Sequence, residues 1–282
     1  MNPPLNQKQA DEIRQNVRES YSEVAESSNN GSSCGEQSSC CGVSDDAAIN
    51  TLVSTRLGYS QDDLDNVPEG ADMGLGCGNP RAIASIKAGE TILDLGSGGG
   101  FDCFLAAAET GESGQVIGID MTPTMISKAR SNAVKGKYNQ VEFRLGEIEH
   151  MPVANDTVNV IISNCVINLS PDKKQVFSEA YRVLKPGGRL AISDVVASTD
   201  LPDEIRNDLA LYSGCMAGAS QISELQTLLE ENGFEQISIK PKDDSKDFIK
   251  DWAPGRGVEE YVLSATIEAV KPGGCCSGGS CC

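Results

Sequence analysis

Short runs of apolar residues alternate with longer amphipathic stretches through the middle of the chain. Each apolar run has the length of one strand, and each amphipathic stretch repeats its apolar residues at the helical period. The strands are expected at residues 91–95, 115–120, 141–145, 158–163 and 189–196. The helices between them are expected at residues 101–109, 123–134 and 173–184. This alternation predicts a parallel, doubly wound α/β sheet, in which ligands bind beyond the carboxyl ends of the strands.

The chain before this region changes composition twice. Residues 7–26 carry apolar positions at the spacing of one helix face, so an amphipathic helix is expected there. Residues 27–44 are rich in Ser, Asn, Gly and Cys and cannot bury a core, which predicts a mobile linker. Ser44 and the two aspartates after it offer an N-cap for a further helix that reaches about Gly58. A glycine-rich loop is expected between Pro68 and Pro80.

The regular alternation stops after Val196. Two helices, at residues 203–211 and 222–232, precede two strands, at residues 237–240 and 260–270. We expect this part to complete the sheet and to cover the ligand site. The final letters GGCCSGGSCC have no hydrophobic content beyond sulfur, which predicts a disordered tail.

The stretch ILDLGSGGGFDC, residues 92–103, reads as a strand, a tight glycine turn and the start of a helix. Its glycines at positions 96, 98, 99 and 100 allow positive φ angles and close approach of the backbone to a ligand. It does not fit the dinucleotide pattern G-x-G-x-x-G, because Phe101 or Cys103 falls at the third glycine position. A nucleotide-type cofactor that lacks a pyrophosphate is therefore favoured over a dehydrogenase cofactor.

Asp120 closes the second predicted strand. An acidic side chain at this point can accept hydrogen bonds from both hydroxyl groups of a ribose. The alternative, that Asp120 only caps the next helix, is disfavoured because Thr122 is the better candidate for the cap.

Composition limits the classes of partner. The chain has 23 Lys and Arg against 41 Asp and Glu, a net charge of -18, which disfavours binding to nucleic acid or to an anionic membrane surface. No apolar run is long enough to cross a bilayer, and the first residues lack the apolar core of a signal peptide. A small substrate and a cytoplasmic location are expected.

Eleven cysteines are many for 282 residues. In a reducing compartment they favour thiol chemistry over a disulfide framework, and none has the C-x2-C spacing of a structural zinc site. Cys77, Cys165 and Cys215 each lie in a loop flanked by glycine or asparagine near the expected ligand edge, a pattern that suits a soft, thiophilic ion.

Two other residues receive no catalytic role. Cys103 begins an apolar helix and is expected to be a buried small hydrophobe. His150, the only histidine, is expected on a surface or loop. A soft ion with a lone pair needs no general base, because such a nucleophile carries no proton.

Two sets of motifs carry a family resemblance. With Asp94 before Gly96, Gly98 and Gly100, the glycine turn resembles motif I of the S-adenosylmethionine methyltransferases. The run SNCVINLSPDK, with LGCGNP upstream and SGCMAGA downstream, resembles the arsenite S-adenosylmethionine methyltransferases over nearly the whole chain. The resemblance implies a Rossmann-like class I S-adenosylmethionine-dependent methyltransferase sheet with helices on both faces, an N-terminal helical segment and a C-terminal α+β cap.

The resemblance also implies roles for particular residues. Cys77, Cys165 and Cys215 would hold trivalent arsenic, whose lone pair would take the methyl group in line. A fourth family cysteine falls on Cys40 or Cys41, and which of the two pairs with Cys77 in a catalytic disulfide stays open. The cofactor, S-adenosylmethionine, would be bound by residues in or beside these motifs, namely Asp94, Gly96, Ser97, Gly98, Asp120, Met121, Glu147, Ile148 and Asn164.

The expected parts are an N-terminal segment (1–69), a methyltransferase domain (70–199), a cap that includes the arsenic-binding region (200–274) and a Cys-rich tail (275–282). Thioredoxin or glutathione would keep the arsenic trivalent and the thiols reduced, as the family implies. Two alternatives remain open at this point. One is a methyltransferase for a carbon or oxygen acceptor such as a quinone, and the other is a non-catalytic thiol-rich protein that binds arsenic or another metal.

Overall fold

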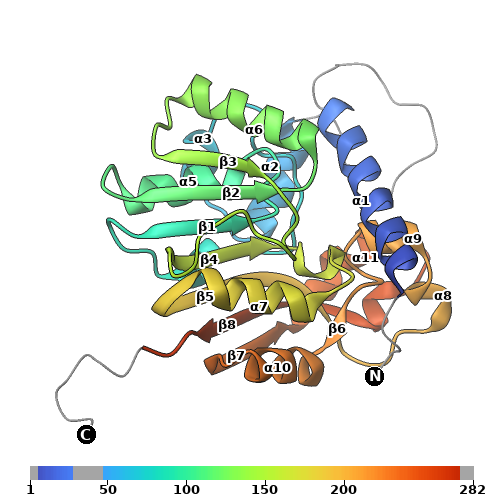
Figure 1. The fold of residues 1–282 in the computed structure, drawn as a ribbon. Coiled ribbons are helices and arrows are strands. Elements are labelled where there is room, and N and C mark those ends of the chain that lie inside the picture. The colour runs from blue at the N-terminus through green and yellow to red at the C-terminus, as the bar shows by residue number, and fades with distance from the viewer. Residues whose placement is uncertain (1–5, 28–46, 274–282) are drawn as a thin grey trace, which may run out of the picture.

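The computed structural model describes residues 6–27 and 47–273. Within them, one eight-stranded sheet has the order β3-β2-β1-β4-β5-β8-β7, with the short β6 paired to β5 (Figure 1). The strands are β1 Thr91–Leu95, β2 Gln115–Asp120, β3 Val141–Leu145, β4 Val158–Asn164, β5 Leu184–Ala197, β6 Ser220–Gln221, β7 Glu235–Lys242 and β8 Val262–Val270.

The first five strands are parallel, as predicted, but β8 runs antiparallel to both β5 and β7. The parallel sheet predicted for the five core strands is confirmed, and the C-terminal strands, for which no direction was predicted, form antiparallel pairs. The reason is the connection, since β7 takes the edge and β8 then turns back to fill the place between β7 and β5. An antiparallel strand near the edge of a mostly parallel sheet is common in α/β proteins.

Helices cover both faces of the sheet, as the resemblance implied. The α-helices are α1 Gln7–Ser27, α2 Ala47–Arg56, α3 Gln61–Asp65, α4 Arg81–Ala84, α5 Phe101–Thr110, α6 Pro123–Gly136, α7 Lys173–Val183, α8 Asp203–Arg206, α9 Leu209–Ser213, α10 Ile222–Glu231 and α11 Lys246–Trp252. Short 3-10 helices occur at η1 Ile167–Leu169, η2 Asp243–Ser245 and η3 Val258–Glu260. Among the described residues, no helix combines the length and the apolar character needed to cross a membrane.

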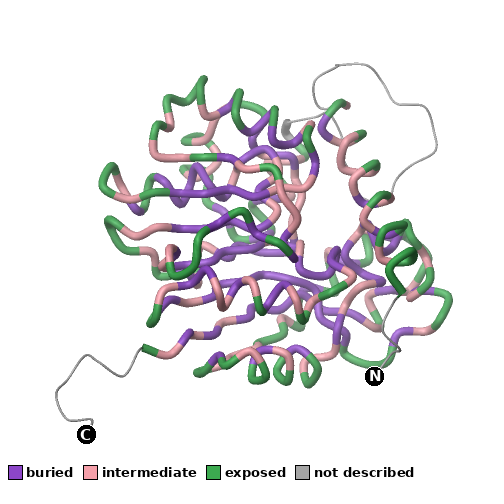
Figure 2. The backbone as a smooth tube through the Cα atoms, viewed as in Figure 1, coloured by how far each residue is buried: buried purple, intermediate pink, exposed green. Residues whose placement is uncertain are grey.

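The core lies on both faces because successive strand residues point to opposite sides. In β1, Leu93 belongs to the cluster that α7 and α10 cover, whereas Ile92 belongs to the cluster on the side of α5 and α6. Phe177 of α7 and Phe104 of α5 are fully buried on these two faces. Figure 2 shows the central strands as almost continuously buried. The two-sided burial explains the uninterrupted apolar run of β4.

Most predicted elements are found within two residues of their expected ends, but two differ. The helix expected at residues 203–211 is two short helices, because Asp208 leaves the helical conformation and its side chain caps α9 through the N–H of Leu211. The strand expected at residues 189–196 is β5, which begins five residues earlier at Leu184 and includes the stretch predicted as the turn before it. The predicted linker and the N-cap at Ser44 lie outside the described residues.

A third apolar cluster lies beyond the carboxyl ends of the central strands. It joins Val17 of α1, Leu211 of α9 and Ile249 of α11 to cysteines from three separate loops. In Figure 1, α1 runs beside the end of the sheet to which the central strands point, and α9 lies next to it. The N-terminal helix and the C-terminal helices thus meet at the edge where ligands of parallel sheets bind.

Candidate functional site

A cavity opens at the carboxyl ends of β1, β2 and β4, at the point between β1 and β4 where the order of strands in the sheet switches direction. Its walls are the glycine turn after β1, the loop at residues 71–76, the loop after β4 and one face of α1. Arg14, Val17 and Tyr21 are the α1 residues that line it. The sequence predicted the helix but gave no sign that it would cover the ligand site.

The glycine turn has the backbone that was predicted for it at three of four positions. Gly96, Gly98 and Gly100 have φ angles of 69°, 50° and 95°, whereas Gly99 lies outside the left-handed region. A Cβ atom on Gly96 would stand 2.3 Å from a methyl carbon of Val166 in the loop after β4. The turn therefore needs glycine both for its conformation and for close contact with the neighbouring loop.

Asp120 fastens this turn to the end of β2. Its Oδ2 accepts from the N–H of Gly98 at 3.0 Å, and its Oδ1 accepts from the N–H of Thr122 at 2.8 Å. Thr122 does occupy the N-cap position of α6, but its side chain makes no capping hydrogen bond, contrary to its expected advantage as a cap. Burial raises the pKa of Asp120, which lines the cavity. Its contact with a ribose stays a prediction.

Two further carboxyl groups line the cavity beside Asp120. Asp94 accepts from the thiol of Cys103 at 3.2 Å, and Asp102 accepts from the hydroxyl of Tyr59 at 2.7 Å. Burial, and then the nearby charge of Asp102, raises the pKa of Asp94 well above its usual range. Burial likewise raises the pKa of Asp102. Asp102 and Tyr59 were not predicted, because no motif marks them and Tyr59 lies far from the glycine turn in sequence.

Asn164, predicted to bind the cofactor, ties β4 to the loop that carries Cys77. Its Oδ1 accepts from the N–H of Cys77 at 3.0 Å, and its Nδ2 donates to the carbonyl of Gly78 at 2.9 Å and to the hydroxyl of Tyr59 at 3.1 Å. A Cβ atom on Gly76 would lie 2.8 Å from Nδ2. Asn164 lines the cavity, but its polar atoms already bind protein groups.

The other predicted cofactor residues divide into two groups. Ser97, Met121 and Ile148 line the cavity. Glu147 is not among the lining residues, and it pairs instead with Arg18 of α1 at 3.2 Å. Its neighbour Glu149 is buried and pairs with Arg14 at 3.1 Å. The end of β3 therefore holds α1 in place.

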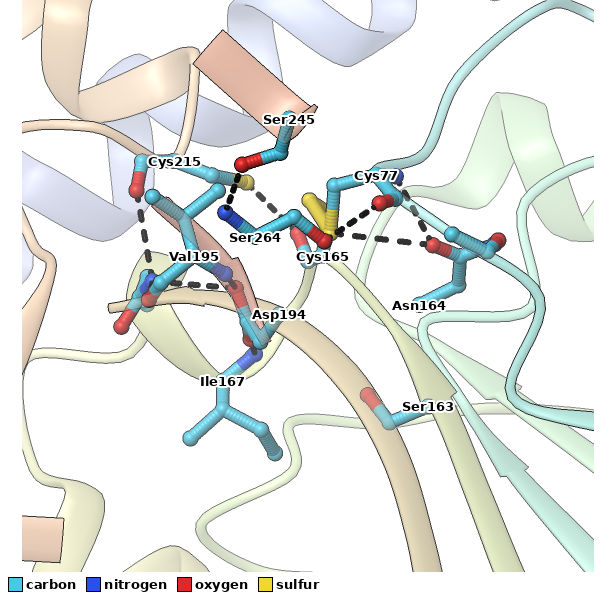
Figure 3. Close-up of a disulfide and its surroundings, with 12 residues drawn as sticks. Cys77, Ser163, Asn164, Cys165, Ile167, Asp194, Val195, Cys215, Ser245 and Ser264 are labelled. Carbon is cyan, nitrogen blue, oxygen red and sulfur yellow. Dashed lines mark hydrogen bonds between the residues drawn. A yellow bond between two sulfur atoms is a disulfide. The ribbon is translucent and has the colours of Figure 1, made fainter. Parts of the chain in front are cut away.

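The structure brings together the three cysteines that the sequence singled out (Figure 3). Cys77 and Cys165 form a disulfide with their Cα atoms 5.8 Å apart, and Cys215 donates from Sγ to the carbonyl of Cys165 at 2.6 Å. The expectation of thiols rather than disulfides is thus wrong for one pair, because the fold places these two side chains in bonding contact. Cys40 and Cys41 lie outside the described residues.

Cys165 and Cys215 both adopt left-handed backbone, with φ angles of 58° and 64°. Side chains other than glycine rarely adopt this conformation, and it persists where the surrounding structure enforces it. Such positions are concentrated at functional sites. Cys165 also lines the cofactor cavity, so the cysteine cluster and the cavity share a wall.

Asp194, in β5, was not predicted. Its carboxylate and the sulfur atoms of Cys77 and Cys165 all lie within 4.8 Å of one another. Burial raises the pKa of Asp194 to about 6, although backbone N–H groups and Lys173 favour its charged form. The sequence offered one signal, because Asp194 lies near the carboxyl end of a parallel strand, where ligand-site residues are expected.

Two predicted placements are confirmed. Cys103 of α5 is fully buried in the core, and His150 is exposed after β3. The contact of Cys103 with Asp94 was not foreseen.

The fold and the site together define a class of protein. Parallel strands in the order β3-β2-β1-β4-β5, a glycine turn after β1 and an acidic residue at the end of β2 form the framework of the class I S-adenosylmethionine-dependent methyltransferases. A family model described as "Methyltransferase domain" matches residues 86–233. The chain is a methyltransferase of this class, and S-adenosylmethionine is its methyl donor.

Within that class, the chain belongs to the arsenite methyltransferase family. It is 53% identical over 269 residues to an arsenite methyltransferase of Halobacterium salinarum, which covers 93% of this chain and 67% of that protein. It is 45% identical over 152 residues to the human arsenite methyltransferase, which covers 51% of this chain and 40% of that protein. The chain thus spans about two thirds of the first relative and less than half of the second.

A solved structure supports the same assignment. The arsenic (III) S-adenosylmethionine methyltransferase from Chlamydomonas reinhardtii superimposes with a TM-score of 0.57 at 32% identity. The match covers 78% of this chain and 73% of that one.

Proposed function

We propose that this chain transfers methyl groups from S-adenosylmethionine to trivalent arsenic held by cysteine thiolates, as part of arsenic detoxification. The products are methylated arsenicals and S-adenosylhomocysteine. One observation carries the proposal. Cys165 lines the cofactor cavity, while its sulfur is bonded to Cys77 and its carbonyl accepts from the thiol of Cys215. Three soft ligands therefore meet at the wall of the cavity that receives the methyl donor.

The cavity fits a cationic donor. When bound, S-adenosylmethionine supplies a methyl group on a positively charged sulfonium. Asp94, Asp102 and Asp120 would face it, and a cation relieves the repulsion among buried carboxylates. The buried hydroxyl of Ser97 has no hydrogen-bond partner among the described residues, which favours a polar ligand at this point. The backbone of the turn at Gly96 would lie against the ligand.

The three cysteines supply the acceptor side. Three thiolates suit a soft trivalent ion better than oxygen or nitrogen ligands do. Cys77, Cys165 and Cys215 are 1%, 8% and 3% exposed, so water is excluded around the bound arsenic. The disulfide between Cys77 and Cys165 must first be opened by two electrons, which releases both thiols.

Thioredoxin or glutathione is the proposed source of these electrons, in a cytoplasmic setting. Cys40 or Cys41 is proposed as a further thiol that takes part in the redox step.

The test is incubation of the reduced protein with labelled S-adenosylmethionine and arsenite, with and without thioredoxin, followed by speciation of arsenic. We expect labelled methylarsenicals and one S-adenosylhomocysteine for each methyl group transferred. Cofactor binding without any arsenic-dependent product would contradict the proposal and would favour a carbon or oxygen acceptor such as a quinone.

Cysteine variants sharpen this test. Cys165→Ser and Cys215→Ser should each reduce arsenite methylation at least a hundredfold, because an oxygen ligand replaces a soft sulfur ligand. Cys34→Ser, the same substitution at a cysteine with no assigned role, should retain wild-type activity. Full activity in either Cys165→Ser or Cys215→Ser would exclude the arsenic role.

A further inference from the structure

Cys165 and Cys215 adopt left-handed backbone, which persists only where neighbouring groups hold it in place. The thiol of Cys215 donates to the carbonyl of Cys165 at 2.6 Å, so the two residues are connected directly. The N–H of Cys165 donates to the carbonyl of Ser193 at 2.8 Å, which fixes this residue to β5. The N–H of Cys215 donates to the carbonyl of Tyr212 at 2.9 Å, which holds this residue at the end of α9. None of these contacts fixes the carbonyl of Cys215 or the loop that follows Cys165.

Asp194 supplies the first of the missing contacts. Its Oδ2 accepts from the N–H of Ile167 at 2.9 Å, and its Oδ1 accepts from the N–H of Val195 at 2.7 Å and from Nδ2 of Asn168 at 2.9 Å. Figure 3 shows this carboxylate between the loop after β4 and the end of β5. Asp194 is 2% exposed, so these bonds do not compete with water.

Asn168 supplies the second contact. Its Nδ2 also donates to the carbonyl of Val195 at 2.6 Å and to the carbonyl of Cys215 at 3.3 Å. Asn168 is 2% exposed as well. The two polar side chains therefore connect the loop of Cys165, the end of β5 and the backbone of Cys215.

Neither side chain lines the cofactor cavity. Asp194 lies within 4.8 Å of the sulfurs of Cys77 and Cys165, but both of its oxygens already accept hydrogen bonds from protein donors. This arrangement favours an action through the backbone of the cysteine loops over direct binding of the ion. In metal sites, residues that do not touch the ion likewise orient the ligands through hydrogen bonds.

We propose that Asp194 and Asn168 are positioning residues that keep the thiols of Cys165 and Cys215 convergent and thereby set the affinity for trivalent arsenic. The inference rests on the proposed function and deepens it. Arsenic affinity should depend on this pair, whereas the affinity for S-adenosylmethionine should not.

Gly218 offers a way to disturb the pair without altering either side chain. A Cβ atom at this position would stand 2.1 Å from the carbonyl oxygen of Asn168. Lys173 donates from Nζ to the carbonyl of Gly218 at 2.6 Å and so holds this segment against the loop. Gly218→Ala should push Asn168 away from its partners.

The experiment uses the reduced full chain. Arsenite binding is followed by the ultraviolet absorption of the arsenic-thiolate bonds, and S-adenosylmethionine binding is followed by calorimetry. Asn168→Asp places an acceptor against three acceptors. Asp194→Asn replaces one of two accepting carboxylate oxygens by a donor amide group that faces N–H donors. Both variants should raise the dissociation constant for arsenite at least tenfold and leave that for S-adenosylmethionine within twofold.

Two results would overturn the inference. The first is wild-type arsenite affinity in Asn168→Asp, since a loss confined to Asp194→Asn would mean that Asp194 acts on the ion itself. The second is an equal loss of arsenite affinity in Val183→Ala. Val183 is a fully buried core position in α7, and its truncation destabilises the protein without touching the cysteines.

If Asn168→Asp and Asp194→Asn do not fold, Gly218→Ala tests the inference in their place. An arsenite dissociation constant at least threefold above wild type supports the inference, and an unchanged constant overturns it. Failure of the proposed function can be distinguished from failure of this inference. In the first case, the wild-type protein itself would bind no arsenite or would methylate none.

Discussion

Asp194 is a carboxyl group almost wholly removed from water at the point where the proposed arsenic ligands meet. Burial raises its pKa from 3.8 to about 6 in the folded protein. Between these two values the folded state therefore holds more protons than the unfolded chain, and stability declines as the pH rises. A shift of this size corresponds to about 3 kcal/mol.

We expect Asp194→Asn to remove this part of the pH dependence, since asparagine does not ionise. Relative to the variant, wild-type protein should lose about 2 kcal/mol of unfolding free energy from pH 4 to pH 7. Other buried carboxyl groups titrate in both proteins and cancel in the difference. Urea titrations across this range measure the effect, and two parallel stability curves would show that Asp194 does not titrate as described.

At the scale of elements, α1 covers the cofactor cavity and is fastened to the end of β3 by charged pairs. Arg14 pairs with the buried Glu149, which also accepts from the hydroxyl of Ser170 at 2.8 Å. Arg18 pairs with Glu147. Because Arg14, Val17 and Tyr21 line the cavity, the position of α1 should influence how tightly the methyl donor is held.

Glu149→Gln should therefore weaken S-adenosylmethionine binding about fivefold and destabilise the protein by about 2 kcal/mol, because it leaves a partly buried guanidinium with one partner fewer. Calorimetry and thermal unfolding provide the two values. Glu231→Gln is the matched control, since Glu231 pairs with Lys174 at an exposed site and should change stability by less than about 0.5 kcal/mol. If Glu149→Gln and wild type bound S-adenosylmethionine equally tightly, the position of α1 would have no influence on cofactor binding.

The order of elements shows what the sequence could predict. The strands β1 to β5 were predictable because each has an apolar run of strand length followed by a helical stretch. The glycine turn and Asp120 were predictable because local spacing determines their conformation and their place at the strand ends. The antiparallel β8 was not, since its partner is chosen by the tertiary fold rather than by its own residues.

Contacts between side chains of different loops could not be predicted from the sequence either. Nothing near Tyr59 indicates that its hydroxyl binds Asp102, and nothing near Glu147 indicates that it pairs with α1 rather than facing the cavity. The disulfide between Cys77 and Cys165 joins residues 88 positions apart, so no local pattern could specify it. The family resemblance identified the cysteines, and the fold determined which of them meet.

At the scale of the whole molecule, one sheet brings distant parts of the chain to a single edge. The N-terminal helix, the loop of Cys77, the end of β4 and the segment of Cys215 all reach the carboxyl ends of the central strands. Cys165 belongs both to the lining of the cavity and to the cysteine cluster, so the proposed donor and acceptor sites adjoin without a change of fold. Opening of the disulfide between Cys77 and Cys165 is the covalent change that the protein itself must undergo before the proposed cycle can bind arsenic.

The central claim is that trivalent arsenic binds to the thiolates of Cys77, Cys165 and Cys215. X-ray absorption at the arsenic edge, on the full chain with one equivalent of arsenite, tests it most directly. After reduction we expect three sulfur neighbours, one fewer in Cys215→Ser, and no bound arsenic in unreduced protein. Oxygen neighbours in the reduced wild type, or three sulfur neighbours retained in Cys215→Ser, would contradict the account.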